Sequence, residues 1–138
     1  MLHKIIRAIT ILIAVALVGY IAFLKMPGAS ASSKEVVAEL TAAELYQAYE
    51  TNENKANNLY LGKAIVISGT IDDKYEDETG APVLLIGPSG EDPVALITLE
   101  ANQKSKLASY EIGSDIKVKG LCSGMLMEVA LTKGIIED

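Results

Sequence analysis

Hydrophobic residues recur at two different spacings along this chain, and the change falls near residue 63. Over residues 42–59 apolar side chains such as Leu45 and Tyr49 follow one face of a helix. From residue 63 onward apolar and polar residues alternate, which is typical of strands with one buried face. The pattern therefore predicts a helix followed by a β domain.

The start of the helix carries the signature of a capping box. The Thr41 hydroxyl can accept a hydrogen bond from the Glu44 amide, and the Glu44 carboxylate can accept one from the Thr41 amide. Leu40 and Leu45 occupy the two positions of a hydrophobic staple around this cap. We expect the helix to begin at residue 42 and to end near residue 59.

Five strands and one short helix are expected after this first helix. Their predicted extents are a strand from residue 63 to about residue 72, a polar turn over residues 73–82, strands over residues 82–87 and 93–99, a helix over residues 101–110, and two strands joined by a tight turn at residues 123–124. Gly69 marks a bend in the first strand. This order is that of a five-stranded OB-like Greek-key barrel. The predicted fold class is therefore mainly β, with a preceding α-helix and a short helix between strands 3 and 4.

Alternate residues of the last two strands are expected to face the barrel interior. This inward set is Ile116, Val118, Gly120, Cys122, Met125, Met127, Val129 and Leu131. The second and third strands are apolar on both faces, so their outer face needs a cover. We expect the helix over residues 42–59 to cover it with Tyr46, Tyr49 and Leu59. The alternative is an exposed patch that meets a partner protein or a lipid surface.

The first quarter of the chain predicts a membrane anchor. Residues 8–24 are 17 consecutive uncharged residues, which as a helix would cover roughly 25 Å of the ~30 Å hydrocarbon core. Lys4 and Arg7 precede this run, so the positive-inside rule keeps the start of the chain in the cytoplasm. This predicts a single-pass transmembrane helix in the cell inner membrane, with the domain on the periplasmic, extracytoplasmic side.

A cleaved signal peptide is the alternative for the same segment. Residues 29–31 read Ala-Ser-Ala, which is similar to a signal-peptidase site. The length of the apolar run, and Lys25 and Pro27 after it, favour an uncleaved anchor. The predicted organisation is a cytoplasmic tip and anchor over residues 1–25, a flexible tether over residues 26–39 and a β domain over residues 40–138.

Two segments of the chain resemble one known family. They are TAAELYQAYETNENKANNLYLGKAIVISGTI at residues 41–71 and IGSDIKVKGLCSGMLMEVALTKGII at residues 112–136, and they include the strand start at Tyr60, Gly62 and Lys63. They resemble the tRNA_anti-like OB-fold group, small bacterial proteins that often carry an N-terminal anchor or signal. The resemblance implies an OB fold and, by analogy with anticodon-binding domains, hints at nucleic acid. It carries no set of catalytic residues.

Charge disfavours nucleic acid as a partner. From Lys34 onward the chain has 9 Lys against 18 Asp and Glu, a net charge of −9, compared with −6 for the whole chain. Proteins that hold single-stranded nucleic acid use a basic groove and stacking aromatic side chains. The predicted β domain contains no Trp and no Phe. Single-stranded nucleic-acid binding therefore stands as the second alternative for the function.

Candidate ligand-binding residues lie in two places. The predicted loop between strands 1 and 2 supplies Asp72, Asp73, Lys74, Tyr75 and Asp77, and strand 4 supplies Lys117 and Lys119. Carboxylates of the loop could hold a hard cation, and the two lysines, with Lys104 and Lys106, could hold an anionic ligand. A solvated loop and a solvated strand face are the simpler interpretations.

Catalysis is not expected from the residues present. His3 is the single histidine, so a Ser-His-Asp triad and a histidine-based zinc site are excluded. Cys122 is the single cysteine and is expected to be a buried thiol. No cofactor and no metal are predicted. The expected function is a non-enzymatic, membrane-anchored OB-fold module that binds an unidentified ligand, with a protein partner at the domain surface. The first alternative is a cleaved periplasmic protein that binds a small ligand or a cation.

Overall fold

The structure is a computed structural model that describes residues 6, 9, 13–17, 20 and 31–138. Most of the predicted anchor at residues 8–24, and the first part of the predicted tether, lie outside the described residues. Within the described residues, no helix has the length and apolar character needed to cross a bilayer.

Five strands close into a barrel: β2 (Ala64–Glu76), β3 (Pro82–Gly87), β4 (Ala95–Leu99), β5 (Asp115–Met125) and β6 (Val129–Glu137). The order around the barrel is β2-β3-β4-β6-β5, and β5 pairs with β2 to complete the ring. Neighbouring strands of this ring are antiparallel except β4 and β6, which are parallel. The turn η2 (Ala101–Gln103) and the helix α4 (Lys104–Ala108) lie between the third and fourth barrel strands. The predicted five-stranded OB barrel is confirmed.

The long strand β2 changes its pairing partner midway. Its first half pairs with β5 and its second half with β3, and both pairings include Thr70. A Cβ on Gly69 would lie 3.2 Å from the Gly87 carbonyl oxygen, so the absence of a side chain permits the close approach of β3. The glycine predicted to mark a bend therefore lies next to the point where β2 passes from one neighbour to the other.

The sheet contains a further strand, β1 (Val36–Thr41), that the sequence does not predict. It follows the turn η1 (Ala31–Ser33) and pairs in parallel with the first half of β2. Residues 36–39, predicted to belong to a flexible tether, therefore lie in the sheet. The physical reason is that β3 pairs only with the second half of β2, so the first half has an edge to which another strand can add.

The predicted helix over residues 42–59 forms as two helices, α2 (Ala42–Thr51) and α3 (Glu53–Tyr60). The capping box is present, because the Glu44 amide donates to Thr41 Oγ1 over 3.1 Å and the Thr41 amide donates to Glu44 Oε2 over 2.9 Å. The break falls at Asn52, whose backbone is extended. Its side-chain oxygen accepts from the Lys55 amide over 3.1 Å, so Asn52 ends one helix and caps the next.

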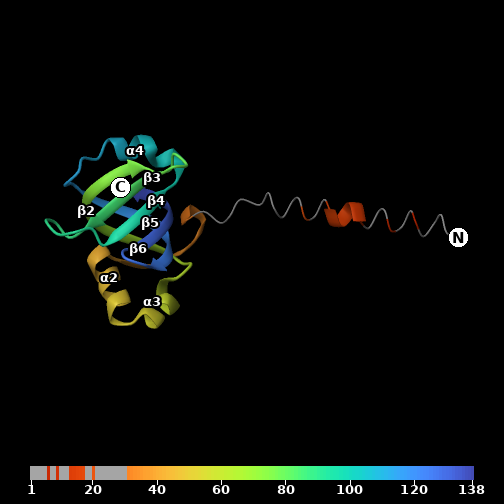
Figure 1. The fold of residues 1–138 in the computed structure, drawn as a ribbon, viewed down its shortest axis with the longest axis horizontal. Coiled ribbons are helices and arrows are strands. Elements are labelled where there is room, and N and C mark those ends of the chain that lie inside the picture. The colour runs from red at the N-terminus through yellow and green to blue at the C-terminus, as the bar shows by residue number, and fades with distance from the viewer. Residues whose placement is uncertain (1–5, 7–8, 10–12, 18–19, 21–30) are drawn as a thin grey trace.

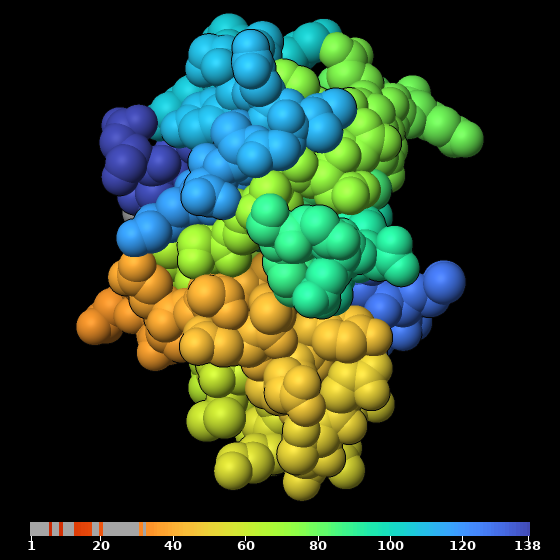
Figure 2. Space-filling model, turned by 90° about the vertical axis from the view of Figure 1, so that its left-hand side faces the viewer, coloured from red at the N-terminus to blue at the C-terminus, as the bar shows by residue number. Residues whose placement is uncertain are grey.

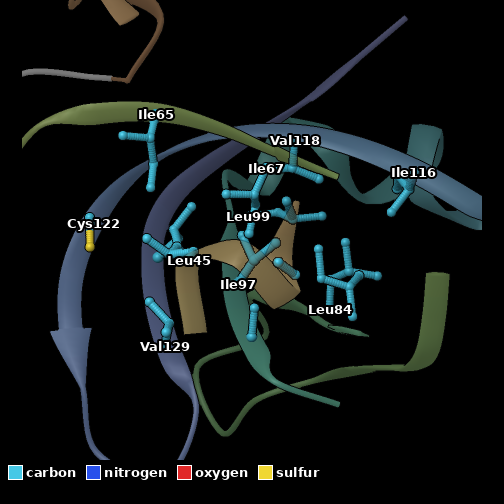
Figure 3. Packing of buried hydrophobic residues seen from close by; sticks show 14 of the residues in the cluster. Leu45, Ile65, Ile67, Leu84, Ile97, Leu99, Ile116, Val118, Cys122 and Val129 are labelled. Atoms are coloured by element: carbon cyan, nitrogen blue, oxygen red, sulfur yellow. The ribbon is translucent and has the colours of Figure 1, made fainter. Parts of the chain in front are cut away.

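Helices lie at both ends of the barrel, α2 and α3 at one end and α4 at the other (Figure 1). Leu45 of α2 is fully buried and points into the core among the inward side chains of the strands (Figure 3). Tyr49 is buried as predicted, whereas Tyr46 is half-buried and Leu59 is 47% exposed. The prediction that this helix covers the outer face of the second and third strands is therefore wrong. The helices lie at an end of the barrel, and the break at Asn52 interrupts the apolar stripe before Leu59.

The β5–β6 hairpin is longer than the sequence predicts. Its turn falls at residues 126–128 rather than 123–124, since β5 continues to Met125. Most of the predicted inward set is buried: Ile116, Val118, Gly120, Cys122, Val129 and Leu131. Met125 is half-buried and Met127 is 81% exposed, so the inward prediction is wrong for Met127. A register shift between Cys122 and Gly124 forms a bulge that disrupts the alternation beyond it.

Replacing Leu45 by alanine is expected to lower the free energy of unfolding by about 2–5 kcal/mol, because its buried side chain fills one end of the barrel. Leu59→Ala is the matched control. Leu59 lies on α3 and is 47% exposed, so a change within about 0.5 kcal/mol is expected. Urea unfolding of the full chain in micelles, followed by far-UV circular dichroism, measures both. Equal losses would contradict a core role for α2.

Candidate functional site

The predicted acidic loop is largely a strand. β2 continues to Glu76, so four candidate residues are strand residues: Asp72, Asp73, Lys74 and Tyr75. The turn is therefore limited to residues 77–81 rather than 73–82. Asp72 and Asp73 are exposed, and Tyr75 is 45% exposed. Since side chains of a strand alternate between its two faces, these residues do not gather around one ligand.

Lys74 has a structural role. Its amine donates to the carbonyl oxygens of Leu107, over 3.2 Å, and of Tyr110. These carbonyls lie at the C-terminal end of α4 and just beyond it, where backbone oxygens lack partners within the helix. Lys74 therefore attaches α4 to the barrel and is engaged by the protein itself.

Asp77 organises the turn that follows β2. Its Oδ1 accepts hydrogen bonds from the Thr79 hydroxyl over 2.6 Å, the Thr79 amide over 2.8 Å and the Ala81 amide over 3.0 Å. These bonds, with the Thr79 hydroxyl first, hold the pKa of Asp77 below its usual range. Among the described residues, no group of three or more His, Cys, Asp or Glu side chains could hold a metal ion. The acidic segment thus offers no prearranged set of cation ligands.

Lys117 and Lys119 lie on β5, away from the acidic segment. Lys119 is half-buried and pairs across the sheet with Val66 of β2. Asp72 lies six residues further along β2 than Val66, which corresponds to about 20 Å at ~3.3 Å per residue. The seven candidate residues are therefore not brought together in one site.

Carboxylates neutralise three of the four lysines in the predicted basic concentration. The ion pairs are Lys104 with Glu76 at 2.5 Å, Lys106 with Asp138 at 2.7 Å and Lys117 with Glu39 at 2.7 Å. Hydrogen bonds to these partners raise the pKa values of Lys106 and Lys117. The pairs are exposed and add little stability. They nevertheless reduce the positive potential that a bound polyanion needs.

Two neighbouring grooves lie over the bend of β2. One has a volume of about 610 Å³ and includes Thr41, Ser68 and Lys117, and the other has a volume of about 870 Å³ and includes Asp72, Glu91 and Asp92. Both grooves include Thr70, Pro88 and Ser89. The first groove combines small hydroxyl-bearing residues with charges of both signs, and the charged residues of the second are all acidic, so together they define no single class of ligand.

A third groove, which we call the hairpin groove, lies between α3 and the end of the β5–β6 hairpin. It has a volume of about 600 Å³ and is lined by Glu53, Asn57, Leu61, Leu96, residues 123–126, Glu128 and Ala130. Leu126 in its lining is 96% exposed, and the adjacent Met127 is 81% exposed. Figure 2 shows the hairpin end, blue at the right-hand edge, projecting beside the yellow helical segment. This groove is a candidate binding site that the sequence does not predict.

A local signal for this site is present in the sequence. Leu126 and Met127 are adjacent, and adjacent residues of a strand cannot both face the interior. Their position between Gly124 and Glu128, near the middle of a hairpin, indicates an exposed turn. Leu96, on the third barrel strand, is half-buried and lines the same groove. Part of the doubly apolar strand surface therefore faces a groove rather than a covering helix.

Cys122 is buried, as predicted, with 2% of its surface exposed. Its Sγ lies 3.3 Å from the Tyr49 hydroxyl in a buried contact between β5 and α2. Burial, followed by this contact with Cys122, raises the pKa of the Tyr49 phenol well above its usual value. The thiol is therefore part of the core rather than of a surface site.

The strand order of the closed barrel, with a helix between its third and fourth strands, defines an OB fold. The tRNA_anti-like family model matches residues 1–136, and the chain belongs to the tRNA_anti-like family. The resemblance that the two sequence segments indicate is therefore confirmed.

The chain is similar to solved structures at low sequence identity. The chain is similar to a proposed nucleic acid-binding lipoprotein from Klebsiella pneumoniae subsp. pneumoniae, with 16% identity and a TM-score of 0.57 over 78% of this chain and 94% of that chain. It is also similar to the crystal structure of yeast Stn1 and Ten1, with 17% identity and a TM-score of 0.45 over 83% of this chain and 66% of that chain. None of the curated proteins matches the chain. At such identity the first likeness establishes the fold alone.

Asp77→Asn is expected to lower stability at neutral pH, because an amide oxygen accepts hydrogen bonds more weakly than a carboxylate does. The folded-state pKa of Asp77 is lowered, so its contribution is present above the ordinary aspartate pKa of about 3.9 and is lost as the pH falls below it. The difference in free energy of unfolding between the two proteins should therefore shrink as the pH falls below about 4. Urea titrations across this range measure it. A constant difference would show that the turn does not depend on the charge.

Proposed function

We propose that this chain is a non-enzymatic, membrane-anchored interaction module. Its OB domain stands on the extracytoplasmic side of the cell inner membrane and binds a partner protein. The contact surface is the hairpin groove together with the adjacent tip residues Leu126 and Met127. The exposure of these two side chains is the observation that carries the proposal.

The hairpin tip is apolar although turns ordinarily use polar residues or glycine. Leu126 is 96% exposed and Met127 is 81% exposed, so neither side chain adds much to the core. Burying one such side chain against a partner contributes about 1.5–3 kcal/mol. Leu61, which is 46% exposed, and the half-buried Leu96 extend the apolar surface into the groove. Apolar surface with a polar rim is typical of protein contact sites.

Nucleic acid is the competing ligand, because the similar Klebsiella lipoprotein is described as nucleic acid-binding. Proteins that bind single strands need a basic groove and exposed aromatic side chains. Within residues 31–138 Tyr75 is the one exposed tyrosine, and the others are half-buried or buried. Three lysines are paired with carboxylates, and Lys74 is bonded to backbone carbonyls. These features support a protein partner over a polyanion.

The anchor part of the proposal predicts how the chain fractionates. The uncharged run at residues 8–24 supports an uncleaved span, so the chain should stay with membranes after carbonate extraction and keep its full mass of 14.7 kDa. Protease added to spheroplasts should remove the domain. A shortened chain in the soluble periplasmic fraction would favour the cleaved alternative. A full-mass soluble chain would contradict an anchor.

Photo-crosslinking tests the partner. A photoreactive residue at position 127 of the full chain, irradiated in membranes, should give discrete protein adducts that survive nuclease treatment. Leu126→Ser should reduce their yield by about tenfold, which corresponds to about 1.4 kcal/mol of lost binding energy. Position 112 is the matched control, because Ile112 is 59% exposed and lies in a different groove. Adducts that disappear with nuclease would indicate nucleic acid, and equal adducts from both positions would contradict the proposed surface.

A further inference from the structure

Much of the surface of the hairpin groove is apolar. Leu61, Leu96 and Leu126 come from three separate parts of the chain and all line it. Gly124 lies between them with a φ of +96°, and a Cβ there would lie 3.6 Å from Leu61 Cδ1 and 3.9 Å from Asn57 Oδ1. The positive φ favours glycine at this position, which leaves no side chain there. A volume of about 600 Å³ is within the range of sites that hold a few side chains of a ligand.

Asn57 supplies a hydrogen-bond acceptor that the protein does not use. Its Oδ1 is buried without a partner, and no other buried side-chain nitrogen or oxygen of the described residues shares this condition. A buried acceptor without a donor costs about 1–3 kcal/mol. Asn57 itself lines the groove, so rotation of its side chain would let a donor that enters the groove bond to this oxygen. An occupant with N–H groups is therefore favoured over one that is purely hydrocarbon.

Negative charge surrounds the groove. Glu53 of α3 and Glu128 of the hairpin turn line it, and among the described residues no lysine does. Neither carboxylate belongs to the ion pairs of Lys104, Lys106 and Lys117. A rim of this sign attracts cations and repels anions.

We propose that the hairpin groove binds a segment of the partner protein in which large aliphatic residues alternate with arginine or lysine. This inference rests on the proposed function. The aliphatic side chains pack on Leu61, Leu96 and Leu126. The cation lies beside Glu53 and Glu128, and an N–H group of the segment donates to Asn57.

Other occupants fit the groove less well. In a two-fold contact with a second copy of this chain, Glu53 and Glu128 would face the same carboxylates of the other copy. Anionic lipid headgroups and nucleic acid carry the charge that the rim repels. A neutral apolar segment would leave the carboxylates without a partner. Charge complementarity therefore selects a cationic and aliphatic segment.

The test uses the full chain in phosphatidylcholine nanodiscs, with empty nanodiscs as the blank, and three fluorescein-labelled decapeptides. The first alternates Leu and Arg, the second alternates Leu and Glu, and the third alternates Ser and Arg. Fluorescence anisotropy should show that the Leu–Arg peptide binds at least about tenfold more tightly than either of the others. Added salt should weaken this binding, because part of it is electrostatic.

Two double variants separate the apolar part of the site from the charged part. Leu126→Ser with Met127→Ser should weaken Leu–Arg binding by about tenfold, whereas Ile112→Ser, at a 59% exposed control position, should leave it unchanged. Glu53→Gln with Glu128→Gln should weaken Leu–Arg binding at low salt without weakening Leu–Glu binding. Far-UV circular dichroism verifies that each variant retains its fold.

Three results would overturn the proposal: equal binding of the Leu–Arg and Leu–Glu peptides, no loss in the tip variant, or no binding of any peptide. Its failure is distinguishable from failure of the proposed function. Nuclease-resistant crosslinks from position 127 that depend on Leu126, together with peptides that do not bind, would mean that the partner chemistry alone is wrong. If neither the crosslinks from position 127 nor peptide binding is observed, the protein-binding function is rejected as well.

Discussion

The change of pairing partner within β2 is the constraint on which the rest of the domain depends. One strand pairs first with β5 and then with β3, and this double use closes the ring. Side chains must be absent where strands approach most closely. Gly69 lies against the Gly87 carbonyl, and a Cβ on Gly134 of β6 would lie 2.7 Å from Leu99 Cδ2. Since a side chain at either position would push strands apart, the glycines limit how the barrel can close.

Closure in this form leaves an edge of β2 unpaired and both ends of the barrel open, and much of the remaining chain covers them. The first half of β2 has an edge that β1 covers, and the open ends of the barrel receive α2 and α4. Polar residues that resemble ligand-binding groups in the sequence serve the same purpose. Lys74 holds α4, Asp77 forms the turn after β2 and Lys117 pairs with Glu39 of β1. The charged side chains near the strand ends of this domain therefore mainly hold secondary-structure elements together.

The hairpin end is different, because its apolar side chains do not contribute to closure. An OB fold accommodates many kinds of ligand, so membership of the family does not select one. Selection comes from this chain's own surface: an excess of carboxylates, lysines largely engaged by the protein, and an apolar tip beside an unpaired acceptor. Together they support the proposed cationic, aliphatic protein segment, and they also explain why a fold shared with a lipoprotein described as nucleic acid-binding need not imply the same ligand.

The amino-acid sequence alone predicts the order of the five barrel strands, the capping box at Thr41 and the extent of β3, because each depends on neighbours within a few residues. It also predicts most of the buried face of β5. It does not predict β1 or the bulge after Cys122, because strand pairing and register depend on which edges are free once distant segments meet. The same holds for the candidate site. Asn57 and Leu126 line one groove although 69 residues separate them, and only the tertiary contact between α3 and the hairpin brings an unused acceptor, two carboxylates and an apolar tip together.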